Sequence, residues 1–327
     1  MLTVPRHLTS GMDDATLEKA ARTAVDQCMG LQADESCLVV TDEKRVAIGE
    51  ALHAVAAERT EDAVLARYLS GDQHGEEPPE PVAAAMTGAD VVLAPTTKSL
   101  SHTNARTDTT AAGARMATLP GITEDVFRTG LDADYEHIRE VCEDVLAQVE
   151  NAAEIRVTSP QGTDVTLDLG DRQWIPDTGI VHEPGAFSNL PAGEVFVSPE
   201  TAEGTIVVDG TMRPRGLLEG HTITLTVADG YVTDIDDPEL RAEVDTAAEA
   251  VGRDASNLAE LGIGTNVAVT DLVGSVLLDE KAAGTVHFAI GDDHGIGGDT
   301  NAPIHLDGIL TDPTVYADGR EIELPES

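Results

Sequence analysis

The sequence is short of lysine: only four of its 327 residues are lysines. Lys and Arg together number 20, against 60 Asp and Glu, so the formal net charge is −40 at pH 7. Nucleic acids and anionic membrane surfaces are bound through Lys and Arg that replace counterions, and a chain this acidic repels both. We therefore expect no nucleic-acid partner and no membrane partner.

Long apolar runs are also missing. No run approaches the roughly 18 residues that suggest a membrane-spanning helix, and residues 1–13 contain no apolar segment of a secretory signal. Three widely spaced cysteines, Cys28, Cys37 and Cys142, form no C-x-x-C pair, which is typical of buried thiols in a reducing compartment. The sequence therefore predicts a cytoplasmic protein.

The excess of negative charge is typical of a halophilic protein that works in molar salt. At about 1 M salt the Debye length falls to roughly 3 Å, so repulsion among the acidic side chains is screened. We predict a melting temperature that rises steeply from dilute buffer to molar KCl, measured by thermal unfolding. A flat dependence would instead indicate an ordinary acidic mesophilic protein.

Helical and strand patterns alternate in residues 1–150. Short apolar runs predict buried strands at Ser36–Thr41 and Ala89–Ala94. Apolar residues at helical spacing make Leu131–Glu150 an amphipathic helix. The other predicted helices are Ala15–Gly30, Arg45–Ala57 and Asn104–Ala117. Strands that alternate with helices indicate an α/β N-terminal domain with a parallel sheet.

From about residue 151 the pattern changes to short runs of period two. These predicted strands are Ile155–Thr158, Val165–Leu169, Thr205–Val208 and Ile223–Val227. Two Asp-Gly pairs, Asp229-Gly230 and Asp318-Gly319, follow strand-like runs and predict hairpin turns. Pro238–Val251 is the one segment here with a helical pattern. The sequence therefore predicts two domains: residues 1–150, and a mostly antiparallel, β-rich domain over residues 151–327.

Histidines in the last third of the chain are candidates for metal binding. In the strand-like stretch IHLDG (304–308), His305 and Asp307 share a face, because side chains alternate along a strand. Such a pair can hold a metal ion, although a solvent-exposed polar face is the alternative. His287 stands alone in the apolar run GTVHFAIG (284–291), where it is either a ligand or a hydrogen-bonded structural residue.

Two glutamates occupy apolar surroundings. Glu194 follows a Pro/Gly turn at the start of an apolar strand, and Glu260 lies inside an apolar, glycine-rich run. A buried carboxylate needs a partner, and a metal ion is one of the few that suffice. In a chain this rich in acids, a surface position is the alternative for each of them.

These residues fall in four stretches that stand in a fixed order: NLPAGEVF (189–196), NLAELGIGTN (257–266), GTVHFAIGD (284–292) and IHLDG (304–308). Together they resemble the metal-site motifs of the thermophilic metalloaminopeptidases, the aminopeptidase T/aminopeptidase S type. Residues 94–106 and 117–123 resemble archaeal members, so the chain is similar to a short, haloarchaeal-like member. The resemblance covers residues 30 to 320 and implies an α/β domain followed by a β-rich domain that carries the metals.

The resemblance also implies a site and an activity. Five residues match the family's metal ligands: Glu194, Glu260, His287, His305 and Asp307. The family's sixth ligand, a tyrosine, is missing, and His294 stands in its place as a candidate catalytic residue. The implied cofactors are two divalent ions (Zn, Co or Mn), which make a hydroxide nucleophile from bound water. The implied protein is a homodimeric aminopeptidase acting on short peptides with a free N-terminus.

Two other hypotheses stay open. A mononuclear Fe(II) ring-cleaving dioxygenase of the dihydroxypyridine type shares the same fold, and His287, His305 and Asp307 would supply its two-histidine, one-carboxylate triad. Retention of Glu194 and Glu260 favours two metals, whereas the missing tyrosine favours one iron. The third hypothesis is a homologue that binds metal without catalysis.

Overall fold

The computed structural model describes residues 16–326. It divides into two compact units: one takes in the chain up to His137 together with Gly179–Ala192, and the other takes in Ile138–Thr178 and the chain from Gly193 onward. Residues 1–13, for which the sequence predicts no secretory signal, lie outside the described residues. The domain boundary expected at residue 150 stays a prediction.

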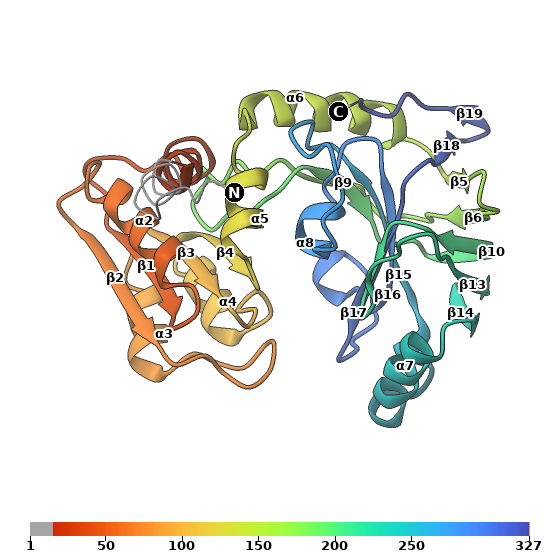
Figure 1. The fold of residues 1–327 in the computed structure, drawn as a ribbon, viewed down its shortest axis with the longest axis horizontal. Helices are drawn as coiled ribbons and strands as arrows, with labels where there is room; N and C mark the ends of the chain where they lie inside the picture. Colours follow the sequence, from red (N-terminus) through yellow and green to blue (C-terminus); the bar gives the residue numbers. More distant parts are fainter. Residues whose placement is uncertain (1–15, 327) are drawn as a thin grey trace, which may run out of the picture. The chain divides into compact units, whose positions relative to one another are not determined.

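A five-stranded parallel sheet forms the centre of the first unit (Figure 1). Its strands, in sheet order, are β2 (Ala63–Tyr68), β1 (Cys37–Asp42), β3 (Val91–Thr96), β4 (Arg115–Pro120) and β8 (Phe187–Asn189). Both β1 and β3 are buried along their whole length, as their continuous apolar runs require. The expected α/β domain with a parallel sheet is confirmed.

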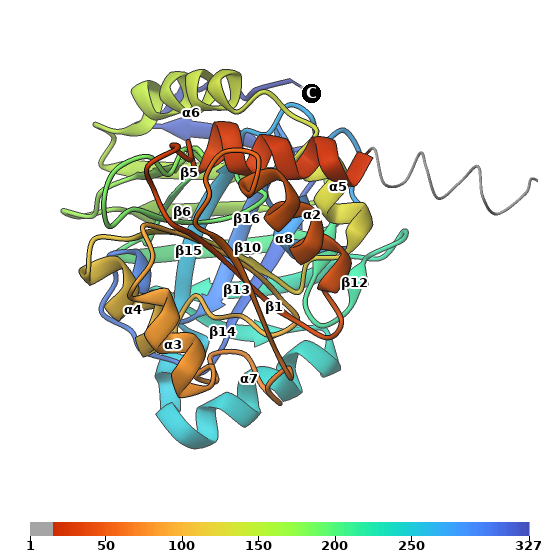
Figure 2. The same cartoon turned by 90° about the vertical axis from the view of Figure 1, so that its left-hand side faces the viewer.

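Helices accompany this sheet. They are α2 (Val46–Ala56), α3 (Glu80–Met86), α4 (Asn104–Ala111), α5 (Glu124–Gly130) and α6 (Tyr135–Val149), the last of which continues into the second unit. Figure 2 shows α3 and α4 side by side. Residues 16–22 are α-helical and continue as the π-helix η1 (Thr23–Cys28), whereas Ala15 of the predicted helix lies outside the described residues. No helix within residues 16–326 combines the length and apolar character needed to cross a bilayer.

One predicted helix is wrong in its second half. The structure ends α4 at Ala111, and Arg115–Pro120 forms strand β4. Gly113 takes a φ of +100°, a conformation that interrupts a helix and that glycine adopts without steric cost. Arg115 then donates its N–H to the carbonyl oxygen of Asp90, the residue directly before β3, so sheet pairing overrides the helical propensity of the alanines.

Two seven-stranded sheets make up most of the second unit, and every pairing in them is antiparallel. In order, the first sheet is β14 (Tyr231–Ile235), β13 (Ile223–Ala228), β10 (Thr201–Val208), β6 (Asp164–Asp168), β5 (Glu154–Thr158), β18 (Thr314–Ala317) and β19 (Arg320–Glu321). The second is β12 (Gly216–Leu217), β11 (Thr211–Met212), β17 (His305–Leu310), β16 (Val286–Gly291), β15 (Leu258–Gly264), β9 (Glu194–Val197) and β7 (Ile175–Asp177). The predicted β-rich, antiparallel character is confirmed.

The turns and the long helix predicted for the second unit are confirmed. The Asp-Gly pairs at 229–230 and 318–319 form the β13–β14 and β18–β19 turns, with all four φ angles positive as a tight hairpin turn requires. Helix α7 (Pro238–Val251) has the predicted bounds and is capped by the Asp237 carboxylate. Three shorter helices were not predicted: η2 (Gly252–Ser256), α8 (Val276–Asp279) and η3 (His294–Ile296).

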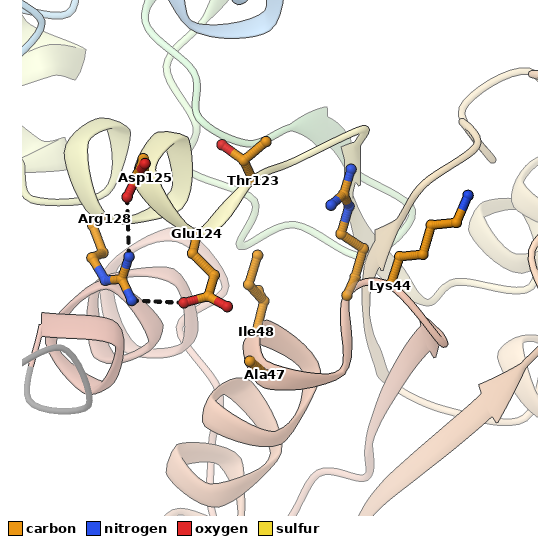
Figure 3. A pocket seen from close by; sticks show the side chains of 8 residues that line it. Lys44, Ala47, Ile48, Thr123, Glu124, Asp125 and Arg128 are labelled. Atoms are coloured by element: carbon orange, nitrogen blue, oxygen red, sulfur yellow. Dashed lines mark hydrogen bonds and ion pairs between the residues drawn. The ribbon is translucent and has the colours of Figure 1, made fainter. Parts of the chain in front are cut away.

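A pocket of about 340 Å³ lies in the first unit, where β1 and β4 end and α2 and α5 begin. Lys44, Arg45 and Arg128 are among its lining residues, and Figure 3 shows Arg128 beside Glu124 and Asp125. Glu124 and Asp125 both form ion pairs with Arg128, at 2.7 and 3.2 Å. The lining therefore has mixed charge, and the acidic partners cancel part of the attraction for a phosphate.

Candidate metal centre

Four neighbouring strands of the second sheet bring the five predicted metal-site residues together. Their order is β17–β16–β15–β9. The side chains come from His305 and Asp307 on β17, His287 on β16, Glu260 on β15 and Glu194 on β9. Antiparallel register places Gly262 opposite His287 and Gly264 opposite Glu194. The sheet therefore joins positions that lie more than a hundred residues apart in the sequence.

Imidazoles and carboxylates alternate through this cluster. The Nε2 atom of His287 lies 3.2 Å from Glu260 Oε1 and 3.3 Å from Glu194 Oε2. The Nε2 atom of His305 lies 3.3 Å from Glu260 Oε2 and 3.3 Å from Asp307 Oδ1. One nitrogen cannot satisfy two carboxylates with a single proton. A cation shared among the same atoms would satisfy all of them.

The unpaired Glu194 Oε2, which faces His287 Nε2, supports a cation shared by these atoms. Within residues 16–326, Glu194 Oε2 and His287 Nδ1 are buried without a hydrogen-bond partner. An unsatisfied buried polar atom costs about 1–3 kcal/mol, so it needs an explanation. Donor atoms of Glu194, Glu260 and His287 all lie within 4.8 Å of one another. This buried group could bind a metal ion.

A backbone carbonyl orients His305. The Nδ1 atom of His305 lies 2.7 Å from the carbonyl oxygen of Asp292, which can only accept, so Nδ1 carries a hydrogen. In the neutral ring the lone pair is then on Nε2, which faces Glu260 and Asp307. A second ring nitrogen bonded to a carbonyl is the usual support of a histidine that binds metal.

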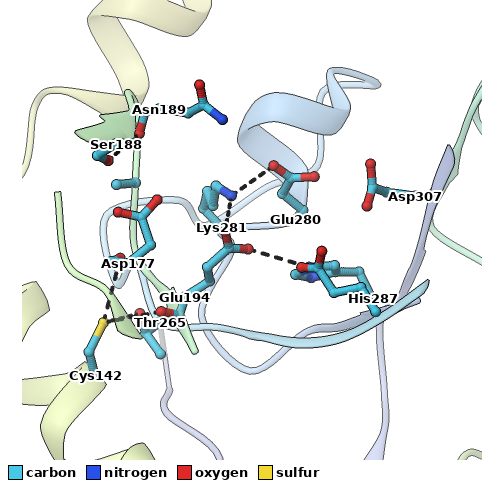
Figure 4. A network of polar contacts seen from close by, with 12 residues as sticks. Cys142, Asp177, Ser188, Asn189, Glu194, Thr265, Glu280, Lys281, His287 and Asp307 are labelled. Carbon is cyan, nitrogen blue, oxygen red and sulfur yellow. Dashed lines mark hydrogen bonds and ion pairs between the residues drawn. The ribbon is translucent and has the colours of Figure 1, made fainter. Parts of the chain in front are cut away.

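A buried lysine, not predicted from the sequence, completes the cluster (Figure 4). Lys281 follows α8, is 3% exposed, and places Nζ 2.5 Å from Glu194 Oε1 and 2.8 Å from Glu280 Oε1. Only four lysines occur in the chain, and this one stands next to the histidine-bearing strand. Lysine is almost never buried unless it is paired with an acidic group. The one sequence feature that could have indicated this pairing is the position of Lys281 close to the strand that carries His287.

Charge and burial compete to set the protonation of these groups. Burial disfavours the charged carboxylate and raises the pKa of Glu194 to about 8. For His287, burial by itself lowers the pKa, but the hydrogen bond to Glu260 and the charge of Glu194 outweigh it and raise the pKa to about 9. The metal-free cluster therefore holds a proton on His287 at neutral pH.

Metal binding should consequently strengthen as the pH rises from neutral toward 9. A metal ion must displace the proton of His287, and each displaced proton weakens the apparent affinity about tenfold per pH unit below the pKa. Competition with a chelator across this pH range would measure the effect. An affinity that does not change with pH would show that His287 is neutral in the free protein.

Gly262 leaves the space in which the His287 ring lies. A Cβ at position 262 would stand 2.1 Å from the ring atoms Cε1 and Nε2. We expect Gly262→Ala to displace the imidazole and to weaken metal binding at least about tenfold, as misplacement of a ligand does. Gly88→Ala is the matched control, because an added Cβ there meets only ordinary contacts at 3.6 Å. Equal affinities in both variants would contradict this expectation.

His294 does not join the cluster. Its side chain is exposed on η3, and none of the cluster contacts found in residues 16–326 involves it. Its neighbour Asp293 is buried instead, where it accepts hydrogen bonds from Ser198 and Asn257. A catalytic role for His294 stays a prediction.

Comparison with known proteins identifies the family. A family model described as "NicX: 2,5-dihydroxypyridine 5,6-dioxygenase" matches residues 23–323. The chain belongs to this family. A curated member, the 2,5-dihydroxypyridine 5,6-dioxygenase of Pseudomonas putida strain KT2440, is 26% identical over 189 residues. That match spans 54% of this chain and 54% of the relative, so it covers about half of each.

Two solved structures share the fold of this chain. The 2,5-dihydroxypyridine dioxygenase of Pseudomonas putida KT2440 has a TM-score of 0.77 at 20% identity, over 95% of this chain and 96% of that one. Wild-type AmpT from Thermus thermophilus has a TM-score of 0.67 at 17% identity, over 94% and 99%. The aminopeptidase resemblance therefore predicted the fold correctly.

The activity implied by that resemblance is wrong. The family model and the curated relative both name a 2,5-dihydroxypyridine 5,6-dioxygenase, which contradicts the predicted hydrolase, aminopeptidase and protease activity. Both kinds of protein share this fold. Buried imidazoles and carboxylates suit zinc hydrolysis and iron oxygenation alike, so the motifs could not decide the reaction. The structure supports a buried group able to bind a metal, and nothing confirms a pair of ions.

Proposed function

We propose that this chain is a mononuclear Fe(II)-dependent dioxygenase that opens a dihydroxylated pyridine ring. The observation that carries the proposal is a chain of contacts in a member of the NicX family: Glu260 lies within 3.3 Å of both His287 and His305, and His305 lies 3.3 Å from Asp307. Two histidines and one carboxylate are the donor set of non-haem Fe(II) oxygenases. The family match covers residues 23–323, which include every residue of the cluster.

These three residues would hold the iron. The ring of His305 is already oriented by the Asp292 carbonyl, and Glu260 lies between both imidazoles, within 3.3 Å of each. Iron bound by such ligands supplies the electron-transfer chemistry that lets O2 react with an electron-rich ring. The protein's part is to orient the donors and to keep them in a largely dry site.

Two other side chains of the cluster, Lys281 and Glu194, would balance its charge and transfer a proton. Lys281 binds Glu194 Oε1, which leaves Oε2 as the oxygen without a hydrogen-bond partner. Burial raises the pKa of Glu194 to about 8, so its carboxylate could accept a proton from a ring hydroxyl above that pH. The ammonium of Lys281 also supplies a positive charge beside two carboxylates, which favours one metal ion over two.

Oxygen consumption tests this proposal directly. The protein, purified in molar KCl, is loaded anaerobically with one equivalent of Fe(II) and then given 2,5-dihydroxypyridine and O2. We expect one O2 to be consumed for each pyridine ring that is lost. An oxygen electrode would measure the O2, and the substrate absorbance would measure the ring. The Zn-loaded protein and His305→Ala serve as controls that should consume none. Stoichiometric iron without oxygen uptake would contradict the proposal.

A further inference from the structure

Asn257 connects the metal cluster to a turn that follows β16. It stands directly before β15, three residues ahead of Glu260. Its side-chain amide donates to two atoms at the end of β16 and just after it: the carbonyl oxygen of Gly291, at 3.1 Å, and Oδ2 of Asp293, at 2.8 Å. Its backbone carbonyl accepts the N–H of Gly291 at 2.9 Å. Asn257 therefore holds both neighbours of Asp292.

Asp293 is the buried end of this contact. It is 3% exposed and, besides Asn257, it accepts from Ser198 Oγ at 3.0 Å and from the Thr300 N–H at 2.7 Å. A Cβ at position 298 would stand 1.9 Å from the Asp293 carboxyl carbon, so Gly298 lets the turn fold over that carboxylate. The carboxylate is thereby fixed from three sides.

The residue between these two anchors faces the metal cluster. The Asp292 carbonyl accepts from His305 Nδ1 at 2.7 Å, and its N–H donates to Ile304 at 2.8 Å. A peptide held at both flanking residues has little freedom to rotate its carbonyl. The direction of that carbonyl sets the plane of the His305 ring and keeps Nε2 aimed at Glu260 and Asp307.

We propose that Asn257 is a positioning residue: with Asp293 it clamps the turn whose Asp292 carbonyl orients His305 for metal binding. The proposal rests on the proposed function for the role of His305 as a ligand. It assigns a purpose to the Asn257 and Asp293 side chains, which lie outside the cluster of donors. A purely structural clamp would affect folding but would leave metal affinity unchanged.

The test measures Zn2+ binding to the whole chain, so it does not depend on turnover. We expect Asn257→Ala to weaken Zn2+ binding about 10–100-fold in a chelator competition, the usual effect of losing an outer partner of a ligand. The Zn-loaded wild type should also show a slowly exchanging Nδ1 proton of His305 by NMR, and this signal should vanish in N257A. Wild-type affinity and an intact Nδ1 signal in folded N257A would overturn the proposal.

Two further variants separate positioning from stability. Thr163→Val removes a buried hydroxyl that bonds Val207 twice in the same unit, so it should cost stability but leave Zn2+ affinity unchanged. Asp293→Asn keeps the size of the side chain but can turn the acceptor that faces the Asn257 amide into a donor. It should therefore weaken Zn2+ binding as N257A does. Wild-type Zn2+ affinity in folded D293N would overturn the clamp, and this variant decides the matter if N257A does not fold.

The outcomes also distinguish this inference from the proposed function. If the wild type binds Zn2+ as expected but the iron-loaded protein consumes no O2, the dioxygenase proposal fails and the clamp stands. If N257A binds Zn2+ like the wild type while the wild type oxidises the ring, the clamp fails and the function stands. A wild type that binds no divalent metal would overturn both.

Discussion

Asp307→Asn should strongly weaken Fe(II) binding and lower kcat/KM for ring cleavage about a thousandfold or more. The substitution keeps the size of the side chain but removes the negative charge, which lies 3.3 Å from His305 Nε2. A bound metal contributes several kcal/mol to transition-state stabilisation, and each 1.4 kcal/mol is a factor of ten in rate. Without the Asp307 carboxylate, the site lacks the one anionic donor of the proposed triad.

Metal content by elemental mass spectrometry and O2 uptake would measure the two effects independently. Asp209→Asn is the matched control, because that carboxylate bonds Thr311 in the same unit and has no contact with the cluster among the described residues. Wild-type iron content and turnover in folded D307N would remove Asp307 from the site. Loss of turnover with retained iron would mean that Asp307 acts on the substrate.

His305 and Asp307 show what sequence periodicity can predict about the site. Alternation along a strand predicts that these two residues share a face, and the structure places His305 Nε2 3.3 Å from Asp307 Oδ1. The burial of Glu194 and Glu260 follows from their apolar neighbours in the same way. Periodicity states which side chains share a face, but not which strands become neighbours in a sheet.

Contacts that depend on pairing of distant segments were therefore missed. Strand β8 lies beyond residue 150 but completes the parallel sheet of the first unit, and three residues are too few for a periodic pattern. The sequence does not single out Lys281 or Asn257, because their partners, Glu194 and Asp293, are distant in sequence. The reaction itself was missed because the same donor types serve hydrolysis and oxygenation.

Lys281→Met should destabilise the metal-free protein by about 3–5 kcal/mol, the usual cost of removing one partner from a buried ion pair. Methionine has a similar length, so the change deletes the charge and leaves Glu194 and Glu280 without their cation. Burial already raises the pKa of Glu194 to about 8, and loss of the ammonium would raise it further. At low pH both carboxylates are neutral, so the deficit relative to wild type should grow as the pH rises.

Urea unfolding of the metal-free variants at constant KCl would measure this deficit. Lys44→Met is the control, because Lys44 is exposed and such a substitution usually changes stability by less than about 0.5 kcal/mol. Adding Glu280→Gln to K281M should restore part of the loss, since it removes a carboxylate together with the cation. A K281M deficit that is small and independent of pH would contradict the ion-pair role of Lys281. In that case the charge of Lys281 would not favour one metal ion over two.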